Sequence, residues 1–297
     1  MLKFLLIEMR PKQWPKNAII FFAFVFSISQ RLHPFDLSKE ATLIALSLMG
    51  FVLFCLLSSA VYLINDLVDI EKDRQHPIKG LRPLASGKIN ARQVIVTVVL
   101  LIGLSLPVSF MLNGAFGLVA LGYFVLNLAY CFSLKNMVIV DVFSIAAGFV
   151  LRAVAGAVII SVPITPWMYV CTLLGALFLG FSKRRHELIL LSDDASKHRA
   201  ILKEYTPELL DEMIAVVTST TVMAYSLYTF TAESLPSNHA MMLTIPFVLY
   251  GIFRYLYLVH LRNEGGSPEE ILLKDRPLLV DIALWLLTSL TILIFFR

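Results

Sequence analysis

The sequence predicts an all-α membrane protein, a single bundle of nine transmembrane helices whose N-terminus lies in the cytoplasm. Of its 297 residues, 58% are hydrophobic and only 15% are charged, whereas about a quarter of the residues of a soluble domain are charged. Apolar runs of about 20 residues, long enough to cross the hydrocarbon core as helices, recur along the whole chain. The connections between these runs alternate between rich and poor in Lys and Arg, which is the pattern of a protein that crosses the membrane repeatedly.

The first residues predict an interfacial segment. Lys3 and Glu8 interrupt the only early apolar stretch, and no small-residue cleavage site follows it, so the segment does not read as a signal peptide. We expect Trp14 at the level of the lipid headgroups and the nearby basic residues on the cytoplasmic side. Pro15 then opens the first span.

The nine spans follow in one domain that covers residues 1–297. We predict them at 17–36, 41–65, 91–112, 115–133, 139–161, 166–182, 211–233, 240–261 and 277–296. The N-terminus and the connections 66–90, 134–138, 183–210 and 262–276 hold most of the Lys and Arg, which places them in the cytoplasm. The three cysteines lie in apolar runs without a CxxC pattern, so we expect them to pack as small core residues.

The stretch from Asn65 to Gly87 carries the main chemical signal. Asp66, Asp69 and Asp73 are spaced i, i+3, i+7, which puts them within about 60° of one another on a helical face. Carboxylates crowded in this way repel one another, and Mg²⁺, a hard cation that bridges carboxylates to phosphates, would relieve the repulsion. A loop punctuated by Pro and Gly follows and carries Arg74, Lys79 and Arg82. We therefore predict a diphosphate site here; the alternative is a solvated connection between two spans.

Spans four and five add polar residues at membrane depth. Tyr130 belongs to a polar stripe on span four, which either faces a substrate or bonds to another helix, and Lys135 follows in a short loop. Asp141 and Arg152, eleven residues apart on span five, share one helical face, with Arg152 about 16 Å deeper. A charged residue at that depth indicates a functional site, and the alternative is a structural pair with another helix.

The end of span six and the connection that follows it complete the set of candidates. Lys183 and Arg184 come at headgroup level, where such cations either bind phosphate or enforce the topology. His76 and His186 have no metal-ligand partner at a recognisable spacing. Thr206, which precedes Pro207, predicts the N-cap of the next helix.

The segment NDLVDIEKD, at the cytoplasmic end of the second predicted span, resembles the NDxxDxxxD signature of the UbiA superfamily of intramembrane prenyltransferases. Further segments narrow the resemblance to the decaprenyl-phosphate phosphoribosyltransferase branch of that superfamily. They are RPKQWPKN (10–17), DRQHPIKGLRPLASG (73–87), YCFSLKNMVIVD (130–141), GFVLRAVAG (148–156) and SKRRHEL (182–188). Together they cover nearly the whole chain.

The resemblance implies a reaction and a set of roles. The donor would be 5-phosphoribosyl 1-diphosphate and the acceptor a polyprenyl phosphate, and the cofactor would be Mg²⁺. Asp66, Asp69 and Asp73 would hold the metal, and Asn65 would assist them. The catalytic set would include Asp141, which would complete the metal shell or bind a ribose hydroxyl. Donor phosphates would be bound by Arg74, Lys79, Arg82 and Lys135, the acceptor phosphate by Lys16, Lys183 or Arg184, and substrate also by Tyr130 and Arg152.

The sequence is also compatible with two other functions. A prenyltransferase of the same superfamily would use the lipid as donor, but most such members carry a second acidic motif, of which only Asp141 remains here. A transporter or lipid flippase would fit the number of spans, but no inverted repeat is evident. We expect an integral protein of a bacterial-type inner membrane that serves cell-envelope biosynthesis, with a cytoplasmic active site. We expect no nucleic-acid partner, while self-association and lipid length stay open.

Overall fold

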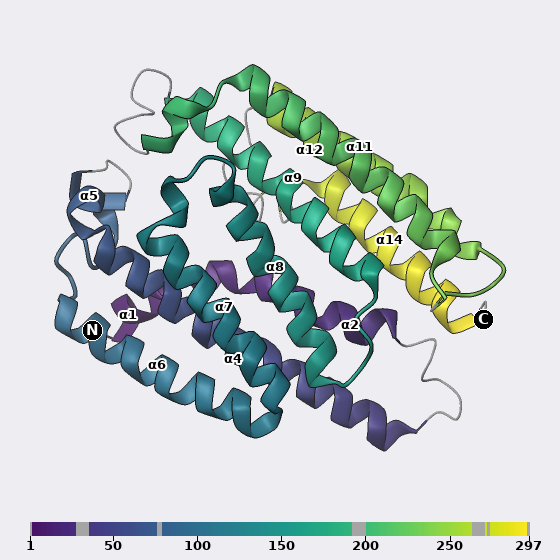
Figure 1. The fold of residues 1–297 in the computed structure, drawn as a ribbon, viewed down its shortest axis with the longest axis horizontal. Helices are drawn as coiled ribbons and strands as arrows, with labels where there is room; N and C mark the ends of the chain where they lie inside the picture. Colours follow the sequence, from purple (N-terminus) through teal and green to yellow (C-terminus); the bar gives the residue numbers. More distant parts are fainter. Residues whose placement is uncertain are drawn as a thin grey trace.

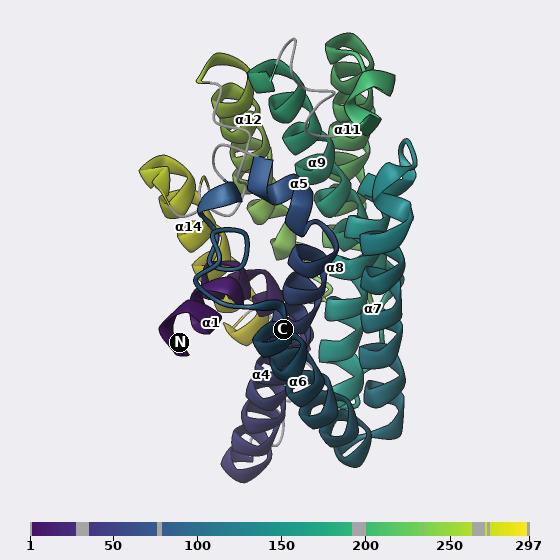
Figure 2. The same cartoon turned by 90° about the vertical axis from the view of Figure 1, so that its left-hand side faces the viewer.

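The protein is a bundle of helices. The computed structural model describes residues 2–27, 36–75, 79–191, 200–233, 235–262, 271 and 274–295, and every regular element among them is helical (Figures 1 and 2). The α-helices are α1 (Leu2–Glu8), α2 (Phe21–Phe26), α4 (Leu37–Val68), α5 (Ile70–Gln75), α6 (Ala91–Leu112), α7 (Gly114–Phe132), α8 (Val140–Ile159), α9 (Pro166–Leu191), α11 (Pro207–Thr231), α12 (Ile245–Leu261) and α14 (Arg276–Phe295). Short 3-10 helices are η1 (Pro11–Ile20), η2 (Lys79–Leu81), η3 (Leu134–Asn136), η5 (Ala200–Glu204) and η6 (Ala240–Thr244).

Seven helices in the described part of the chain are long and apolar enough to cross a membrane. They are α4, α6, α7, α8, α11, the continuous segment Ala240–Leu261 formed by η6 and α12, and α14. The all-α class and the membrane setting are thereby confirmed. The two other predicted spans, 17–36 and 166–182, coincide with η1 and α2 and with α9. The count of nine and the cytoplasmic N-terminus stay predictions, and residues 28–35 of the first span lie outside the described part.

The N-terminal segment differs from the expectation that Pro15 opens a membrane helix. Pro11 and Pro15 both lie within η1, and the chain becomes α-helical only at Phe21. Proline lacks the N–H that an α-helix needs and clashes with the preceding turn, so this stretch takes the tighter 3-10 form. Trp14 attaches η1 to α4, because its indole Nε1–H donates to the hydroxyl of Ser59 at 3.1 Å.

Helix α4 ends at the acidic stretch. Asp36 caps its N-terminus by accepting from the backbone N–H groups of Ser38 and Lys39. At the other end Asp69 leaves helical geometry, with φ −97° and ψ 8°, and α5 begins one residue later. The three aspartates therefore do not share one continuous helix, as their spacing suggested. They lie on α4, at its end and on α5, and the chain bends between them.

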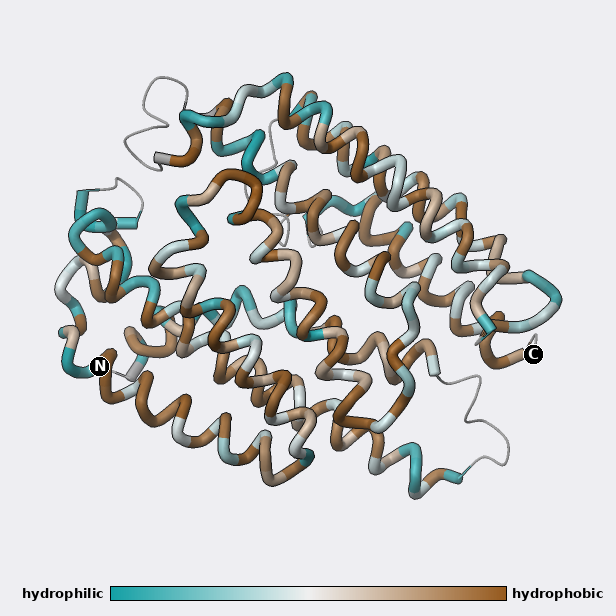
Figure 3. Tube along the Cα trace, viewed as in Figure 1, coloured by the Kyte–Doolittle hydropathy of each residue, from teal (hydrophilic) through white to brown (hydrophobic). Residues whose placement is uncertain are grey.

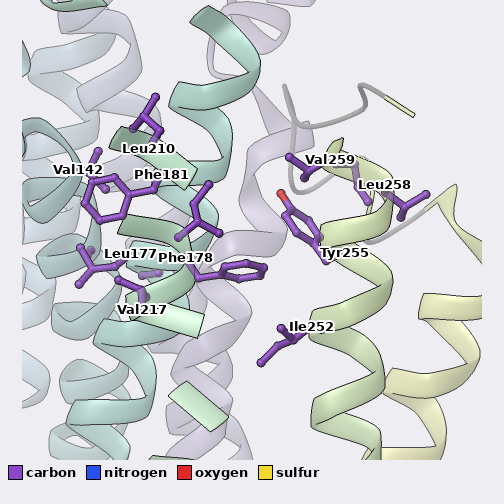
Figure 4. Close-up of a cluster of buried hydrophobic side chains, with 14 of the residues drawn as sticks. Val142, Leu177, Phe178, Phe181, Leu210, Val217, Ile252, Tyr255, Leu258 and Val259 are labelled. Atoms are coloured by element: carbon purple, nitrogen blue, oxygen red, sulfur yellow. The ribbon is translucent and has the colours of Figure 1, made fainter. Parts of the chain in front are cut away.

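Helix α8 is the element that joins the two halves of the bundle. Its first turns, through Val142 and Ala146, pack in a cluster with α9, α11 and α12. Figure 4 shows that cluster, in which Phe178 of α9 faces Tyr255 of α12 with ring centroids 5.2 Å apart. Its last turns, through residues 155–159, pack with η1, α2, α4 and α7. Both clusters thus depend on the small residues of one central helix.

The predicted cytoplasmic connections gather at one end of the molecule. In Figures 1 and 2, α5 and the N-terminal end of α11 lie at the same end of the bundle. Figure 3 shows that α5 is hydrophilic, whereas the long helices are mainly hydrophobic. The connection before α11 confirms the predicted cap, since Thr206 Oγ1 accepts from Leu209 N–H at 3.2 Å. The charged loops are thus placed together where they can form one site.

The contact between η1 and α8 yields a first prediction. A Cβ added at Gly156 would lie 2.0 Å from the backbone oxygen of Ile20, so the replacement of Gly156 by Ala forces two backbones apart. We expect this variant to lose about 2–3 kcal/mol of folding stability, the upper range for overpacking. Gly122→Ala is the matched control, because nothing lies within 4 Å of its added Cβ. Thermal unfolding in detergent, followed by tryptophan fluorescence, measures both, and equal midpoints would contradict the prediction.

Candidate functional site

A large cavity runs through the bundle. Its volume is about 1270 Å³, and η1, α2, α4, α7, α8, α9, α11 and α14 all contribute to its wall. One part of the wall is charged and includes Asp69, Asp73, Lys79, Arg82 and Lys135. Another part is aromatic and apolar and includes Phe22, Phe26, Trp167, Met168, Tyr225, Tyr228 and Trp285. The cavity therefore combines a surface for a polar anion with a surface for a hydrocarbon chain.

Arg82 brings two of the three aspartates together. Its Nη1 donates to Asp66 Oδ1 at 2.9 Å and to Asp73 Oδ2 at 2.5 Å. Arg10 also donates to Asp66 Oδ1, at 2.5 Å, and its guanidinium stacks on the ring of Tyr62. Both carboxylates are buried, and these cations balance charges that burial alone would make costly.

Asp69 has a separate partner. Lys135, carried by η3 from the other side of the cavity, donates to both carboxylate oxygens at 2.8 and 2.7 Å. Residues 66 positions apart in the sequence are thus in direct contact. The three acids and the three cations form a cluster without net formal charge, and we call these six residues, Arg10, Asp66, Asp69, Asp73, Arg82 and Lys135, the ionic cluster.

The ionic cluster fits a divalent cation by its donor set. Asp66 Oδ2 is buried and accepts no hydrogen bond in the described part of the chain, so a carboxylate oxygen there is unsatisfied. Among the described residues no three His, Cys, Asp or Glu side chains are arranged so that they could together hold a metal ion. Mg²⁺ commonly needs only one or two carboxylates and takes its remaining ligands from phosphates and water. Asp66, Asp69 and Asp73 would hold it, with Arg82 and Lys135 free to turn to phosphate oxygens.

Asp141 lies in a different environment from the other acids. It is fully buried and is not part of the cavity wall. Arg184 Nε donates to its Oδ2 at 2.6 Å, and the hydroxyl of Tyr205 donates to its Oδ1 at 3.1 Å. Tyr205 also accepts from the backbone N–H of Ile139 at 2.6 Å, and burial raises the pKa of its phenol to about 12. The predicted catalytic or metal role of Asp141 is untested, and this geometry favours a positioning role.

Arg184 and its neighbours form the wall on the side of α9. Arg184 is 1% exposed and pairs with Glu187 as well as Asp141, with its Nη1 donating to Glu187 Oε2 at 2.6 Å. Its remaining contact is with the hydroxyl of Tyr130 at 3.5 Å. Lys183 also contributes to the cavity wall. Of the cations predicted for the acceptor phosphate on this helix, Arg184 is held by two protein carboxylates.

Most of the predicted site residues line the cavity. Those that do are Lys16, Asn65, Asp69, Asp73, Lys79, Arg82, Tyr130, Lys135, Arg152, Lys183 and Arg184. Asp66 and Asp141 lie buried behind the wall. Arg74 is elsewhere, because it pairs with Glu71 on the exposed side of α5 at 2.8 Å. Its predicted role with donor phosphates remains a prediction, and no described contact brings it to the ionic cluster.

Sequence reasoning missed two partners of the cluster. The sequence predicts a cytoplasmic position for Arg10 and includes it in the segment RPKQWPKN but assigns it no contact, whereas in the structure it is bound to Asp66, 56 positions away. Glu8 was interpreted only as an interruption of an apolar run, yet it is 2% exposed. Its pKa is raised to about 7, first by burial and then by the charge of Asp66, while Arg10 and Arg82 oppose the shift. The sequence feature that could have pointed to Arg10 and Glu8 is the density of charged residues at the start of the chain.

The buried pair of Asp141 with Arg184 yields a prediction that separates two roles. We expect Asp141→Asn to lower the free energy of unfolding by about 3 kcal/mol, because it leaves a buried guanidinium with less compensation. Asp69→Asn serves as the comparison, since Asp69 lies on the cavity wall and is partly exposed. Thermal unfolding of both variants measures the difference. A stable Asp141→Asn protein with a large rise in substrate KM would instead favour direct ligand binding by Asp141.

Glu8 yields a prediction about pH. Its pKa rises from 4.5 to about 7 on folding, so the folded protein holds this proton more tightly than the unfolded chain. The corresponding stability is fully present below pH 4.5 and is lost as the pH approaches about 7. We expect Glu8→Gln to remove this loss and to be more stable than the parent by about 2–3 kcal/mol at pH 8. The test is to measure the unfolding midpoints of the parent protein and of Glu8→Gln between pH 5 and 8, with the exposed Glu71→Gln as control. The prediction would be refuted if the midpoints of the parent protein and of Glu8→Gln changed with pH in the same way.

Several known proteins are similar to this chain in sequence or in fold. Decaprenyl-phosphate phosphoribosyltransferase of Mycolicibacterium smegmatis is 32% identical over 95% of this chain and 90% of its own length. The protein of the same name from Corynebacterium glutamicum is 32% identical over 93% of this chain and 82% of its own. A solved UbiA homologue from Archaeoglobus fulgidus, bound to GPP and Mg²⁺, superposes with a TM-score of 0.71. The superposition covers 98% of this chain and 99% of the homologue, with 20% sequence identity, and it shows that the two proteins share a fold.

The family model described as the UbiA prenyltransferase family matches residues 18–270, which include every residue of the ionic cluster except Arg10. The match spans most of the chain, and the relatives at 32% identity extend over nearly all of it. The chain belongs to the UbiA prenyltransferase family.

Proposed function

We propose that this protein transfers the 5-phosphoribosyl group of 5-phosphoribosyl 1-diphosphate to a polyprenyl phosphate, in a reaction that depends on Mg²⁺ and releases diphosphate. The observation that carries the proposal is the cavity itself. It joins carboxylates and cations suited to a metal-bound diphosphate with an aromatic, apolar region suited to a polyprenyl chain. The relatives at 32% identity are named for the same transfer, with decaprenyl phosphate as the lipid.

The proposed reaction needs no dedicated general base. An oxygen of the acceptor phosphate attacks C1 of the ribose, and the bond between C1 and the diphosphate oxygen breaks, with the electron pair leaving on the diphosphate. A phosphate monoester has a second pKa near 6 and is already largely anionic at neutral pH, so no proton has to be removed first. The protein therefore has to position two anions and stabilise the leaving group.

The residues of the ionic cluster match those tasks. Asp66, Asp69 and Asp73 would hold Mg²⁺, which when bound stabilises charge on the departing diphosphate. Arg82 and Lys135 would exchange their carboxylate partners for phosphate oxygens, and Lys79 lies on the same wall. Arginine suits this role because its planar fork binds two oxygens of a phosphate at once. In the absence of substrate, the same cations keep the acids neutralised in place.

The setting of the reaction is part of the proposal. The protein is an integral membrane protein, and we infer a bacterial-type inner membrane with the ionic cluster at the cytoplasmic face. The basic connections support this orientation by the positive-inside rule, and the soluble donor would enter from that side. Transfer of a prenyl group from a prenyl diphosphate is the related reaction that the assay below distinguishes.

The proposal predicts metal-dependent transfer of label. Purified protein in detergent, with radiolabelled 5-phosphoribosyl 1-diphosphate and a polyprenyl phosphate, should move label into the lipid phase with Mg²⁺ and not with EDTA. We expect Asp69→Asn to lower kcat by a factor of 100 or more, because leaving-group stabilisation by a metal amounts to several kcal/mol.

The matched control is Asp36→Asn, a carboxylate-to-amide change at the opposite end of α4. Asn caps a helix as well as Asp does, so this variant should retain the parent rate. Transfer that survives both EDTA and Asp69→Asn would contradict the proposed site. Release of diphosphate from a prenyl diphosphate, without phosphoribosyl transfer, would contradict the proposed reaction.

A further inference from the structure

Arg152 is a buried cation in the wall of the cavity, away from the ionic cluster. It lies on α8 and is 7% exposed. Three neutral groups hold it: Nε donates to Asn17 Oδ1 at 2.7 Å, Nη2 to the hydroxyl of Tyr123 at 2.7 Å, and Nη1 to the backbone oxygen of Gly148 at 3.0 Å. The guanidinium also lies 4.7 Å from the centre of the Tyr123 ring. Its orientation is therefore set by three elements, η1, α7 and α8.

The charge of Arg152 has no protein counterion in the described part of the chain. Two other arginines of the long helices, Arg184 of α9 and Arg254 of α12, are each paired with a carboxylate. A guanidinium has five N–H groups, and the three neutral partners use three of them. Two N–H groups and the full positive charge remain on a residue that borders the cavity.

A purely structural link does not account for this arrangement. A charge buried in a membrane protein is costly unless it is compensated, and neutral acceptors compensate it only in part. A Gln or Tyr would bond to Asn17 and Tyr123 without that cost. Instead the residue is an arginine, stacked on an aromatic ring and supported by hydrogen bonds, as is typical of a site that binds an anion at a fixed orientation.

The contacts of Arg152 place it apart from the ionic cluster. Asn17, which accepts from Arg152, donates through Nδ2 to the hydroxyl of Ser58 on α4 at 3.3 Å. Ser58 is eight residues before Asp66 on the same helix, which is about 12 Å along its axis. Arg152 is therefore attached to a part of α4 about two turns before the acidic stretch, where it can contact a phosphate other than the diphosphate held at the cluster.

We propose that Arg152, oriented by Asn17 and Tyr123, binds the phosphate monoester of a substrate in the membrane-embedded part of the cavity. The inference rests on the proposed function, which supplies two such groups: the 5-phosphate of the phosphoribosyl donor and the phosphate of the lipid acceptor. Both are dianionic tetrahedral groups that a guanidinium binds through two oxygens. In either case Arg152 orients one phosphate of a substrate relative to the ribose C1 at which the transfer takes place.

The test is equilibrium binding to the full-length protein in detergent with Mg²⁺, which needs no turnover. One arm compares ribose 5-phosphate with ribose, and the other compares a short polyprenyl phosphate with the polyprenol of the same length. We expect Arg152→Gln to weaken the binding of one phosphate probe at least tenfold and to leave its unphosphorylated counterpart unchanged. The arm that responds identifies the source of the phosphate.

The control is Arg254→Gln, which removes an arginine that is paired with Asp275 and does not line the cavity. It should leave all four affinities at the parent value. Two further variants cover a failure of Arg152→Gln to fold. Arg152→Lys keeps the charge without the fork, and Tyr123→Phe removes one orienting hydroxyl, and each should weaken the responding probe several-fold.

The outcomes separate this inference from the proposed function. Parent-like affinity for both phosphate probes in folded Arg152 variants, or binding of neither probe by the parent protein, would overturn the inference. Failure of the parent protein to transfer phosphoribosyl, while phosphate binding still depends on Arg152, would overturn only the proposed reaction. In steady-state kinetics the same variant should raise the KM of the responding substrate more than it lowers kcat, which a general loss of structure would not do.

Discussion

The pairing of three aspartates with cations from distant segments is the constraint on which the site depends. Asp66, Asp69 and Asp73 come from the bend between α4 and α5, whereas their partners come from the start of η1, the loop after α5 and the short helix η3. Without these partners, buried like charges would repel one another and open the bend. The same cations match phosphate oxygens, so the contacts that keep the site closed are those that substrate would replace.

Arg184 and Arg152 show two different uses of a buried charge. Arg184 is bound to Asp141 and Glu187, and with Tyr205 it connects α8, α9 and the segment before α11. Its charge is compensated by the protein, so its role is to fix the wall of the cavity. Among the described residues Arg152 has only neutral partners, and this is the basis of its proposed role in binding a phosphate. Burial alone does not distinguish these roles; the identity of the partners does.

Small residues on α8 allow both halves of the bundle to reach the cavity. Gly156 lets the backbone of η1 approach closely, and this contact brings Asn17 within hydrogen-bonding distance of Arg152. Ala146 and Val142 serve the other half, where α9 and α11 pack. The position of the proposed phosphate site is therefore a consequence of helix packing, and a substitution at Gly156 would disturb it from a distance.

Composition and periodicity were enough to predict a helical membrane protein, the acidic stretch and several of the charged residues that line the cavity, because hydrophobic length and local charge spacing are properties of the chain itself. The cap at Thr206 was predictable for the same reason. The bend at Asp69, the 3-10 form of η1, and the partners Arg10, Asn17 and Tyr123 were not, since they arise from contacts between segments far apart in sequence. For the same reason only the folded bundle shows that Asp141 is enclosed by Arg184 and Tyr205, whereas Arg152 contacts neutral groups in the part of the chain that the structure describes. The spacing of residues along a helix determines on which face a side chain lies, but the packing of the helices determines which residues it contacts.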